Sequence, residues 1–213
     1  MNTILSDKQL LIHPTVEYNK LLCSIYPFLF CGSNKDKDDS YTYTWQDDIP
    51  VGWRIAFCPG IWEDFKAAIL ADIEKSLVSE YPDEAIRKEK AKNLYDTQIE
   101  DYFSFVQIKE KYGTLRLYHT GGAAALEVEY KYDALSENIC IECGAPAEVL
   151  SLGWISPYCQ KCIDQLNSDR NWKIKTIPLS SHFFANSAFS DRNPYPGCIA
   201  SHFILIAVSI IAS

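Results

Sequence analysis

The fold class is decided by residues 102–119, which read YFSFVQIKEKYGTLRLYH. Apolar side chains stand at alternate positions on both sides of a connection that contains Gly113. Alternation with a period of two is typical of strands with one buried face, and a glycine between two such runs indicates a turn. The sequence therefore predicts a β-hairpin with strands at 103–108 and 114–119.

Helical patterns flank this hairpin. Apolar residues advance by three and four positions over 61–80, which predicts a long amphipathic helix that ends at Tyr81 because a proline follows. A second, more charged helix is expected from Asp83, and helical spacing returns from Val128 until it reaches Cys140. We therefore predict an α+β fold in which helices pack on a small antiparallel sheet. The helix face expected to pack on the hairpin consists of Trp62, Phe65, Ile69, Ile73 and Leu77.

The N-terminal region combines a short helix with an acidic loop. Apolar residues recur at helical spacing from Pro14 until Pro27. From Gly32 to Asp48 the chain is polar and acidic, and we expect a loop that ends in an edge strand. A solvated charge run is favoured over a calcium loop, because no glycine stands where an EF-hand loop needs its sharp turn.

Two cysteine pairs carry the strongest chemical signal. Cys140 and Cys143 form one CxxC pair, Cys159 and Cys162 form another, and 15 residues separate the pairs. This spacing is typical of a site in which four thiolates hold one zinc ion. The remaining cysteines lie singly in apolar stretches, where a free cysteine is typically a small buried hydrophobe.

The ligand set indicates a structural metal. Four thiolates complete a tetrahedral shell and leave no place for water or substrate, so we expect structural Zn²⁺ as the cofactor. A redox-active pair and rubredoxin-like iron are the alternatives. Between the pairs, apolar residues around Gly153 suit a short hairpin, and a helix is expected near Ile163. Together, knuckle, hairpin and helix predict a C-terminal treble-clef or zinc-ribbon module.

Composition places the chain among acidic globular proteins. The 213 residues carry a net charge of −8 and 47% of them are hydrophobic, which excludes a disordered tail and a protein that coats duplex DNA through a general basic field. The N-terminus lacks a signal-peptide pattern and paired cysteines suit a reducing compartment, so we expect a cytoplasmic protein. Prolines interrupt the chain before the apolar stretch 203–212, where we expect a buried strand or terminal helix and no membrane span.

One local cluster is basic and aromatic within this acidic chain. Such a cluster suits stacking on single-stranded nucleic acid, while simple alternation would place the same side chains on the solvent face of the hairpin. The sequence lacks the common catalytic motifs, and His119 is the first residue to consider as a general base, although a lone histidine is more often structural. The cluster consists of Lys109, Lys111, Tyr112, Arg116 and Tyr118.

These features predict four parts along the chain. Residues 1–48 hold the N-terminal helix and acidic loop, 49–138 the α+β body, 139–178 the zinc-binding module, and 179–213 an apolar C-terminal segment. No low-complexity linker separates the body from the module, so we expect them to share one compact unit.

Several motifs occur in a distinctive order. They are GWRIAF at 52–57, QIKEKYGTLR at 107–116, the first CxxCG, Gly153-Trp154-Ile155 and the second CxxC. In combination they resemble a family of small uncharacterised zinc-binding proteins from phages, prophages and bacterial mobile regions, over roughly residues 50–165. The resemblance implies an accessory gene in the conflict between phage and host or between competing bacteria, and it supplies no catalytic residues.

We therefore expect a non-enzymatic, zinc-stabilised accessory protein that binds and modulates another protein, as a host-defence inhibitor or an immunity-type partner does. The acidic stretches 36–48 and 63–101 are candidate surfaces for a basic partner. One alternative is a nucleic-acid-binding zinc-ribbon module in which Arg170, Lys173 and Lys175 join the basic cluster. A second alternative is an enzyme without a sequence-level signature.

Overall fold

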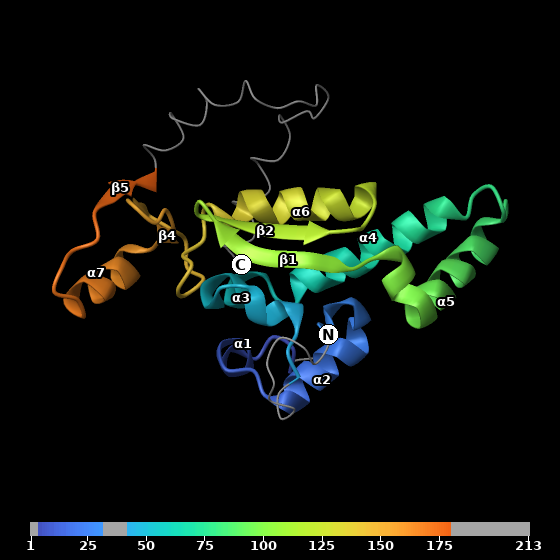
Figure 1. Cartoon of the computed structure of the whole chain (residues 1–213), viewed down its shortest axis with the longest axis horizontal. Helices are drawn as coiled ribbons and strands as arrows, with labels where there is room; N and C mark the ends of the chain where they lie inside the picture. Colours follow the sequence, from blue (N-terminus) through green and yellow to red (C-terminus); the bar gives the residue numbers. More distant parts are fainter. Residues whose placement is uncertain (1–3, 32–41, 180–213) are drawn as a thin grey trace, which may run out of the picture. The chain divides into compact units, whose positions relative to one another are not determined.

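The computed structural model describes residues 4–31 and 42–179, which belong to one compact unit, Met1–Leu179 (Figure 1). The unit has the predicted α+β architecture, with helices and small antiparallel sheets. The expectation for 203–212, and most of the predicted segment 179–213, lie outside the described residues. The division of the chain into four parts at residues 48, 138 and 178 stays a prediction.

The helices outnumber the strands in the described part of the chain. The helices are α1 (Lys8–Ile12), α2 (Val16–Ile25), α3 (Val51–Phe57), α4 (Gly60–Ser76), α5 (Glu84–Tyr102), α6 (Ala123–Ser136) and α7 (Gln160–Ser168), with short 3-10 helices η1 (Pro27–Leu29) and η2 (Trp45–Asp48). The strands are β1 (Phe105–Lys111), β2 (Thr114–His119), β3 (Val149–Ser151), β4 (Pro157–Tyr158) and β5 (Thr176–Pro178). Strands β1 and β2 form one sheet, and β4-β3-β5 form a second.

The predicted hairpin is confirmed as β1 and β2, which pair in antiparallel register with Lys111 opposite Thr114. Its two-residue turn has positive φ at both positions, 55° at Tyr112 and 82° at Gly113. Two consecutive positive φ angles match the right-handed twist of the strands, and glycine adopts such an angle without strain. The turn therefore fixes which face of each strand is buried.

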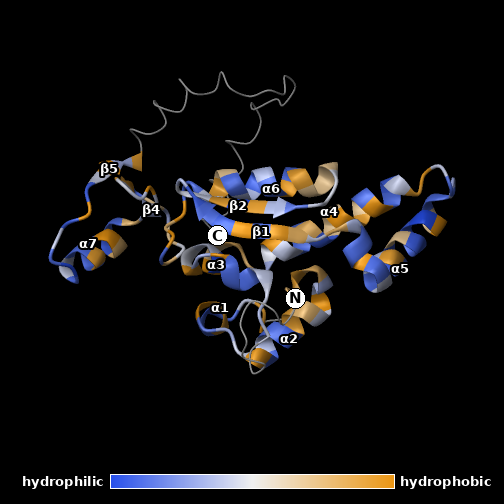
Figure 2. Ribbon diagram, in the orientation of Figure 1, coloured by the Kyte–Doolittle hydropathy of each residue, from blue (hydrophilic) through white to orange (hydrophobic). Residues whose placement is uncertain are grey.

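Helix α4 packs part of its predicted face, Trp62 and Phe65, against Phe105 of the hairpin, and it also contacts α5 and α6. Its apolar residues, including Trp62, Phe65 and Ile69, are buried, and the Phe65 ring lies 5.1 Å from that of Phe105 in β1. Helix α6 lies along β2 and also contacts α4, whereas α5 is mostly hydrophilic (Figures 1 and 2). Helix α4 ends at Ser76, whereas the sequence predicted a helix that continues to residue 80. The residues after Ser76 form turns instead of a last helical turn.

The end of the acidic loop differs from the expected edge strand. Thr44 forms a single β-bridge with Phe30, and η2 begins at the next residue. Asp47 ends the strand conformation because its Oδ2 accepts a hydrogen bond from the Thr44 backbone N–H at 2.7 Å, as in a helix cap. Gln46 is buried, and its Oε1 accepts a hydrogen bond from Trp62 Nε1 at 2.8 Å. The segment is therefore anchored in the core.

Candidate metal centre

The four cysteines of the CxxC pairs meet at one point. Their sulfur atoms all lie within 4.8 Å of one another, and Cys143 Sγ lies 3.6 Å from Cys159 Sγ. Ligands at the usual Zn–S distance of about 2.3 Å on a tetrahedron are about 3.8 Å apart. The arrangement therefore fits a single metal ion, and Cys140, Cys143, Cys159 and Cys162 are the residues that would hold it.

The first knuckle follows α6 closely. Cys140 N–H donates to Ala145 O at 2.7 Å, and Gly144 N–H donates back to Cys140 O at 3.0 Å. Gly144 has a φ of +78°, and an added Cβ would lie 2.7 Å from Gly52 O. A side chain at position 144 is therefore excluded both by backbone strain and by close approach, which explains the glycine after the first CxxC pair.

The second knuckle is built by a short hairpin and a helix. Strands β3 and β4 pair in antiparallel register between the cysteine pairs, as predicted, and Gly153 in their turn has a φ of +96°. Cys159 is the N-cap of α7, so Cys162 lies in the first turn of that helix. The sequence did not indicate β5, which adds a third strand by pairing with β3.

Helix α3 holds the first knuckle from the body. Gly52 N–H donates to Ile141 O at 2.8 Å, and Trp53 Nε1 donates to Ile139 O at 3.0 Å. A Cβ at Gly52 would lie 2.2 Å from Cys140 O, so only glycine permits this approach. The sequence analysis did not assign this role to the GWRIAF motif, because a glycine inside a helix signals close packing without naming the partner.

Burial and local dipoles separate the cysteine pKa values. Burial raises the pKa of Cys140 and that of Cys162. Burial acts in the same direction on Cys143, but hydrogen bonds from the Ala145 backbone and neighbouring thiols outweigh it and lower its pKa. Metal ligands must be deprotonated thiolates. An ion at this centre would therefore displace the protons that burial favours on the Cys140 and Cys162 thiols.

The hairpin register brings members of the predicted basic and aromatic cluster together, with Lys109 directly opposite Arg116. Arg116 forms an ion pair with Asp133 of α6 and is only partly exposed. The Lys109 Nζ lies 5.3 Å from the centre of the Tyr118 ring on the outer face of the hairpin. Arg116 is therefore engaged by Asp133, whereas Lys109 also donates to Gln107 Oε1 at 2.5 Å, and simple strand alternation accounts for the outward position of these side chains.

The remaining two members of the cluster lie at the hairpin turn. Lys111 and Tyr112 are exposed, with the lysine Nζ 5.5 Å from the ring centre. The turn contacts the metal-binding region, since a Cβ at Gly113 would lie 3.4 Å from Ile155 Cγ2 and 3.5 Å from Pro157 Cδ. Lys111 and Tyr112 therefore lie beside the segment between the two knuckles, residues 144–158.

His119 is packed inside the body. Its side chain is 2% exposed, and its ring stacks on Phe103 with 5.2 Å between ring centres. Nδ1 accepts a hydrogen bond from Gly121 N–H at 3.0 Å, and Nε2 lies 3.5 Å from Glu129 Oε2. Burial lowers the pKa of His119 and raises that of Glu129. This environment is that of a neutral core histidine, without access for a substrate.

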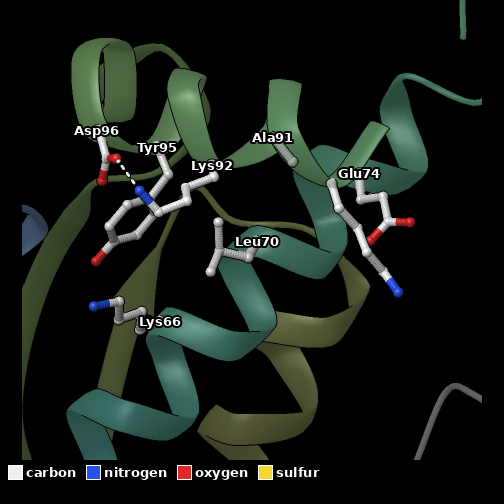
Figure 3. A pocket seen from close by; sticks show the side chains of 8 residues that line it. Lys66, Leu70, Glu74, Ala91, Lys92, Tyr95 and Asp96 are labelled. Carbon is white, nitrogen blue, oxygen red and sulfur yellow. Dashed lines mark hydrogen bonds and ion pairs between the residues drawn. The ribbon is translucent and has the colours of Figure 1, made fainter. Parts of the chain in front are cut away.

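The acidic stretch 63–101 presents mixed charge. A hollow of about 280 Å³ between α4 and α5 is lined by lysines as well as carboxylates (Figure 3). Lys88 contacts Glu84 at 2.5 Å and Lys92 contacts Asp96 at 3.1 Å, so these two carboxylates of α5 are paired with lysines. The full lining is Lys66, Leu70, Glu74, Lys88, Ala91, Lys92, Tyr95 and Asp96.

Comparisons with known proteins do not indicate a function for this chain. No family model matches the chain, and no curated protein or solved structure matches it significantly. The relation to phage and mobile-element proteins therefore stays a prediction from the motifs. Among residues 4–31 and 42–179, no helix combines the length and apolar character needed to cross a membrane.

Proposed function

We propose that this chain is a non-enzymatic binding protein in which a structural zinc ion stabilises the surface that contacts a partner. The observation that carries the proposal is the exposure of Trp154, which is 77% accessible to solvent in the turn between β3 and β4. Tryptophan is usually largely buried, and it is among the residues most enriched in binding hot spots.

The exposed tryptophan is held by a defined turn. Ser151 Oγ accepts a hydrogen bond from Ser156 N–H at 3.0 Å and donates to Trp154 O at 2.5 Å. Ser151 and Ser156 are buried. An aromatic side chain on an ordered turn loses little entropy when a partner covers it, which favours binding.

The metal would supply folding energy to this region. Four thiolates close the coordination shell, so zinc at this centre would be structural. The order of knuckle, β3–β4 hairpin, second cysteine pair and α7 supports our assignment of a treble-clef or zinc-ribbon module. Because β3 and β4 lie between the knuckles, losing the ion would loosen the turn that carries Trp154.

The partner expected from the sequence was a basic protein docked on acidic stretches. Residues 36–41 of the first stretch lie outside the described residues, and mixed charge on α5 gives the second stretch less support than the Trp154 turn. The buried position of His119 likewise gives the enzymatic alternative no support at that residue. The sequence led us to expect modulation of another protein. We keep the accessory role, widen the partner class to a macromolecule, and propose that the contact lies on the metal module.

Capture with matched variants tests this function. The full zinc-loaded chain, immobilised, is exposed to lysate of the native host with and without nuclease, alongside Trp154→Ala and Tyr130→Ala. Tyr130 is 49% exposed on α6 and controls for loss of any exposed aromatic group. We expect wild type and Tyr130→Ala to retain the same partner and Trp154→Ala to lose it. Equal retention by all three would refute the proposed contact.

A further inference from the structure

Three segments that are distant in sequence meet around the Trp154 turn. They are the hairpin turn 111–113, the β3–β4 turn 152–155, and the segment 170–175 between α7 and β5. Leu152 N–H donates to Lys175 O at 2.8 Å, which joins the second segment to the third. The first segment reaches the second because the position of a Cβ on Gly113 lies 3.4 Å from Ile155 Cγ2.

These segments share an unusual composition. They read KYG, LGWI and RNWKIK, with four cations and no carboxylate, in a chain whose net charge is −8. All four cations are exposed, and none forms an ion pair with a carboxylate in the described part of the chain. The cations are Lys111, Arg170, Lys173 and Lys175. The three segments are called the basic aromatic surface below.

Each segment of the basic aromatic surface also exposes a large aromatic ring. Tyr112 is 72% exposed, Trp154 is 77% exposed and Trp172 is 61% exposed. Two of these rings have a cation beside them: Lys111 Nζ lies 5.5 Å from the Tyr112 ring centre, and Arg170 Cζ lies 5.1 Å from that of Trp172. Exposed rings alternating with unpaired cations are the features that bind bases and phosphates of a single strand.

Two carboxylates directly precede these segments in the sequence, and each accepts a hydrogen bond. Glu110, just before the first segment, accepts a hydrogen bond from Gly113 N–H through Oε1 at 2.7 Å. Asp169, just before the third, accepts one from Ser168 Oγ at 3.1 Å. These hydrogen bonds leave the carboxylate charges in place, but the three segments themselves carry only cations, and this local positive charge opposes the repulsion of a polyanion by the acidic chain as a whole.

We propose that the basic aromatic surface binds single-stranded nucleic acid, with phosphates at the four cations and bases stacked on Tyr112, Trp154 and Trp172. This inference rests on the proposed function, since it names the partner class of the same surface. A duplex keeps its bases stacked internally and offers no faces to these rings, so the single strand is favoured. An acidic protein would also satisfy the cations and can cover an exposed tryptophan, so an acidic peptide is one of the probes below. Three exposed rings, two of them beside cations, favour the single strand.

Fluorescence anisotropy of the full zinc-loaded chain with labelled oligo-dT of about 15 nucleotides tests the inference. We expect Trp154→Ala to weaken binding by about 5- to 150-fold, and Trp154→Phe to restore most of it. The logarithmic salt slope should be about −0.7 for each phosphate contact, so Lys173→Ala should make it shallower by about 0.7. Lys90→Ala is the control, since Lys90 is also an exposed lysine but lies on α5, with its Nζ 5.8 Å from the centre of the Tyr81 ring.

Two further probes separate the outcomes. A duplex of the same length and a polyglutamate peptide are measured beside oligo-dT. Preference for oligo-dT with loss in Trp154→Ala supports the inference. Equal binding of the duplex, or equal binding of polyglutamate, overturns it; the latter result assigns the surface to acidic protein and leaves the proposed function intact. Absence of oligo-dT binding also overturns the inference, while the capture experiment decides the proposed function separately.

Discussion

Gly52→Ala should destabilise the protein although alanine normally favours a helix over glycine by about 1 kcal/mol. The new Cβ would lie 2.2 Å from Cys140 O and 2.5 Å from Ile141 C, both backbone atoms of the first knuckle. Relief requires α3 to move away, which breaks the hydrogen bonds from Gly52 N–H to Ile141 O and from Trp53 Nε1 to Ile139 O.

The magnitude follows from these contacts. Two lost hydrogen bonds cost about 1 kcal/mol each, and forced overpacking costs about 1 to 3 kcal/mol. After the helix-propensity gain is subtracted, we expect a net loss of about 2 to 4 kcal/mol. For a protein of this size that corresponds to a fall in melting temperature of roughly 4 to 16 °C.

Gly60→Ala is the matched control. Gly60 also lies at the start of a helix, as the first residue of α4. The nearest atom to its added Cβ would be Tyr132 Oη at 3.8 Å, which is an ordinary contact. Circular dichroism melts of the zinc-loaded variants should therefore show Gly60→Ala at or above the wild-type midpoint and Gly52→Ala well below it. Coincident melting curves for Gly52→Ala and Gly60→Ala would refute the packing of α3 on the knuckle.

Three other outcomes follow from the same structure. Elemental analysis should find one zinc per chain, and Cys143→Ser should lower both metal content and melting temperature, whereas Cys23→Ser, outside the cluster, should leave metal content unchanged. Ile69→Asp should unfold the protein, because an unpaired charge at a buried site costs several kcal/mol, while Ala67→Asp on the exposed face of α4 should retain a cooperative melt. Burial lowers the pKa of His119, so the unfolded chain binds a proton at this ring more readily than the folded chain does, and stability falls as pH drops below about 6.5. NMR titration of the His119 ring should give a midpoint below that value. A midpoint above it would contradict the buried neutral state.

Local periodicity in the sequence determined the principal elements. The three- and four-residue spacing of Ile69 and its neighbours predicted the buried face of α4, and alternation around Gly113 predicted the hairpin. The CxxC spacing predicted the cysteine cluster, because two intervening residues are enough to direct both sulfurs of a pair at one point. Each of these predictions depends on residues close together in the chain, where backbone geometry alone fixes which side chains share a face.

Contacts across long sequence separations were decided only by the tertiary structure. Asp72 of α4 accepts hydrogen bonds from Ala124 N–H and Ala125 N–H at the start of α6, so a helix cap comes from a residue that no local capping pattern includes. The packing of α3 on the first knuckle and the addition of β5 to β3 are of the same kind. The basic aromatic surface also arises in this way, because its three segments become neighbours only when the hairpin turn and β5 pack against the β3–β4 turn. A sequence pattern records the faces of individual elements, whereas the pairing of faces depends on shape and hydrogen bonding in the assembled fold.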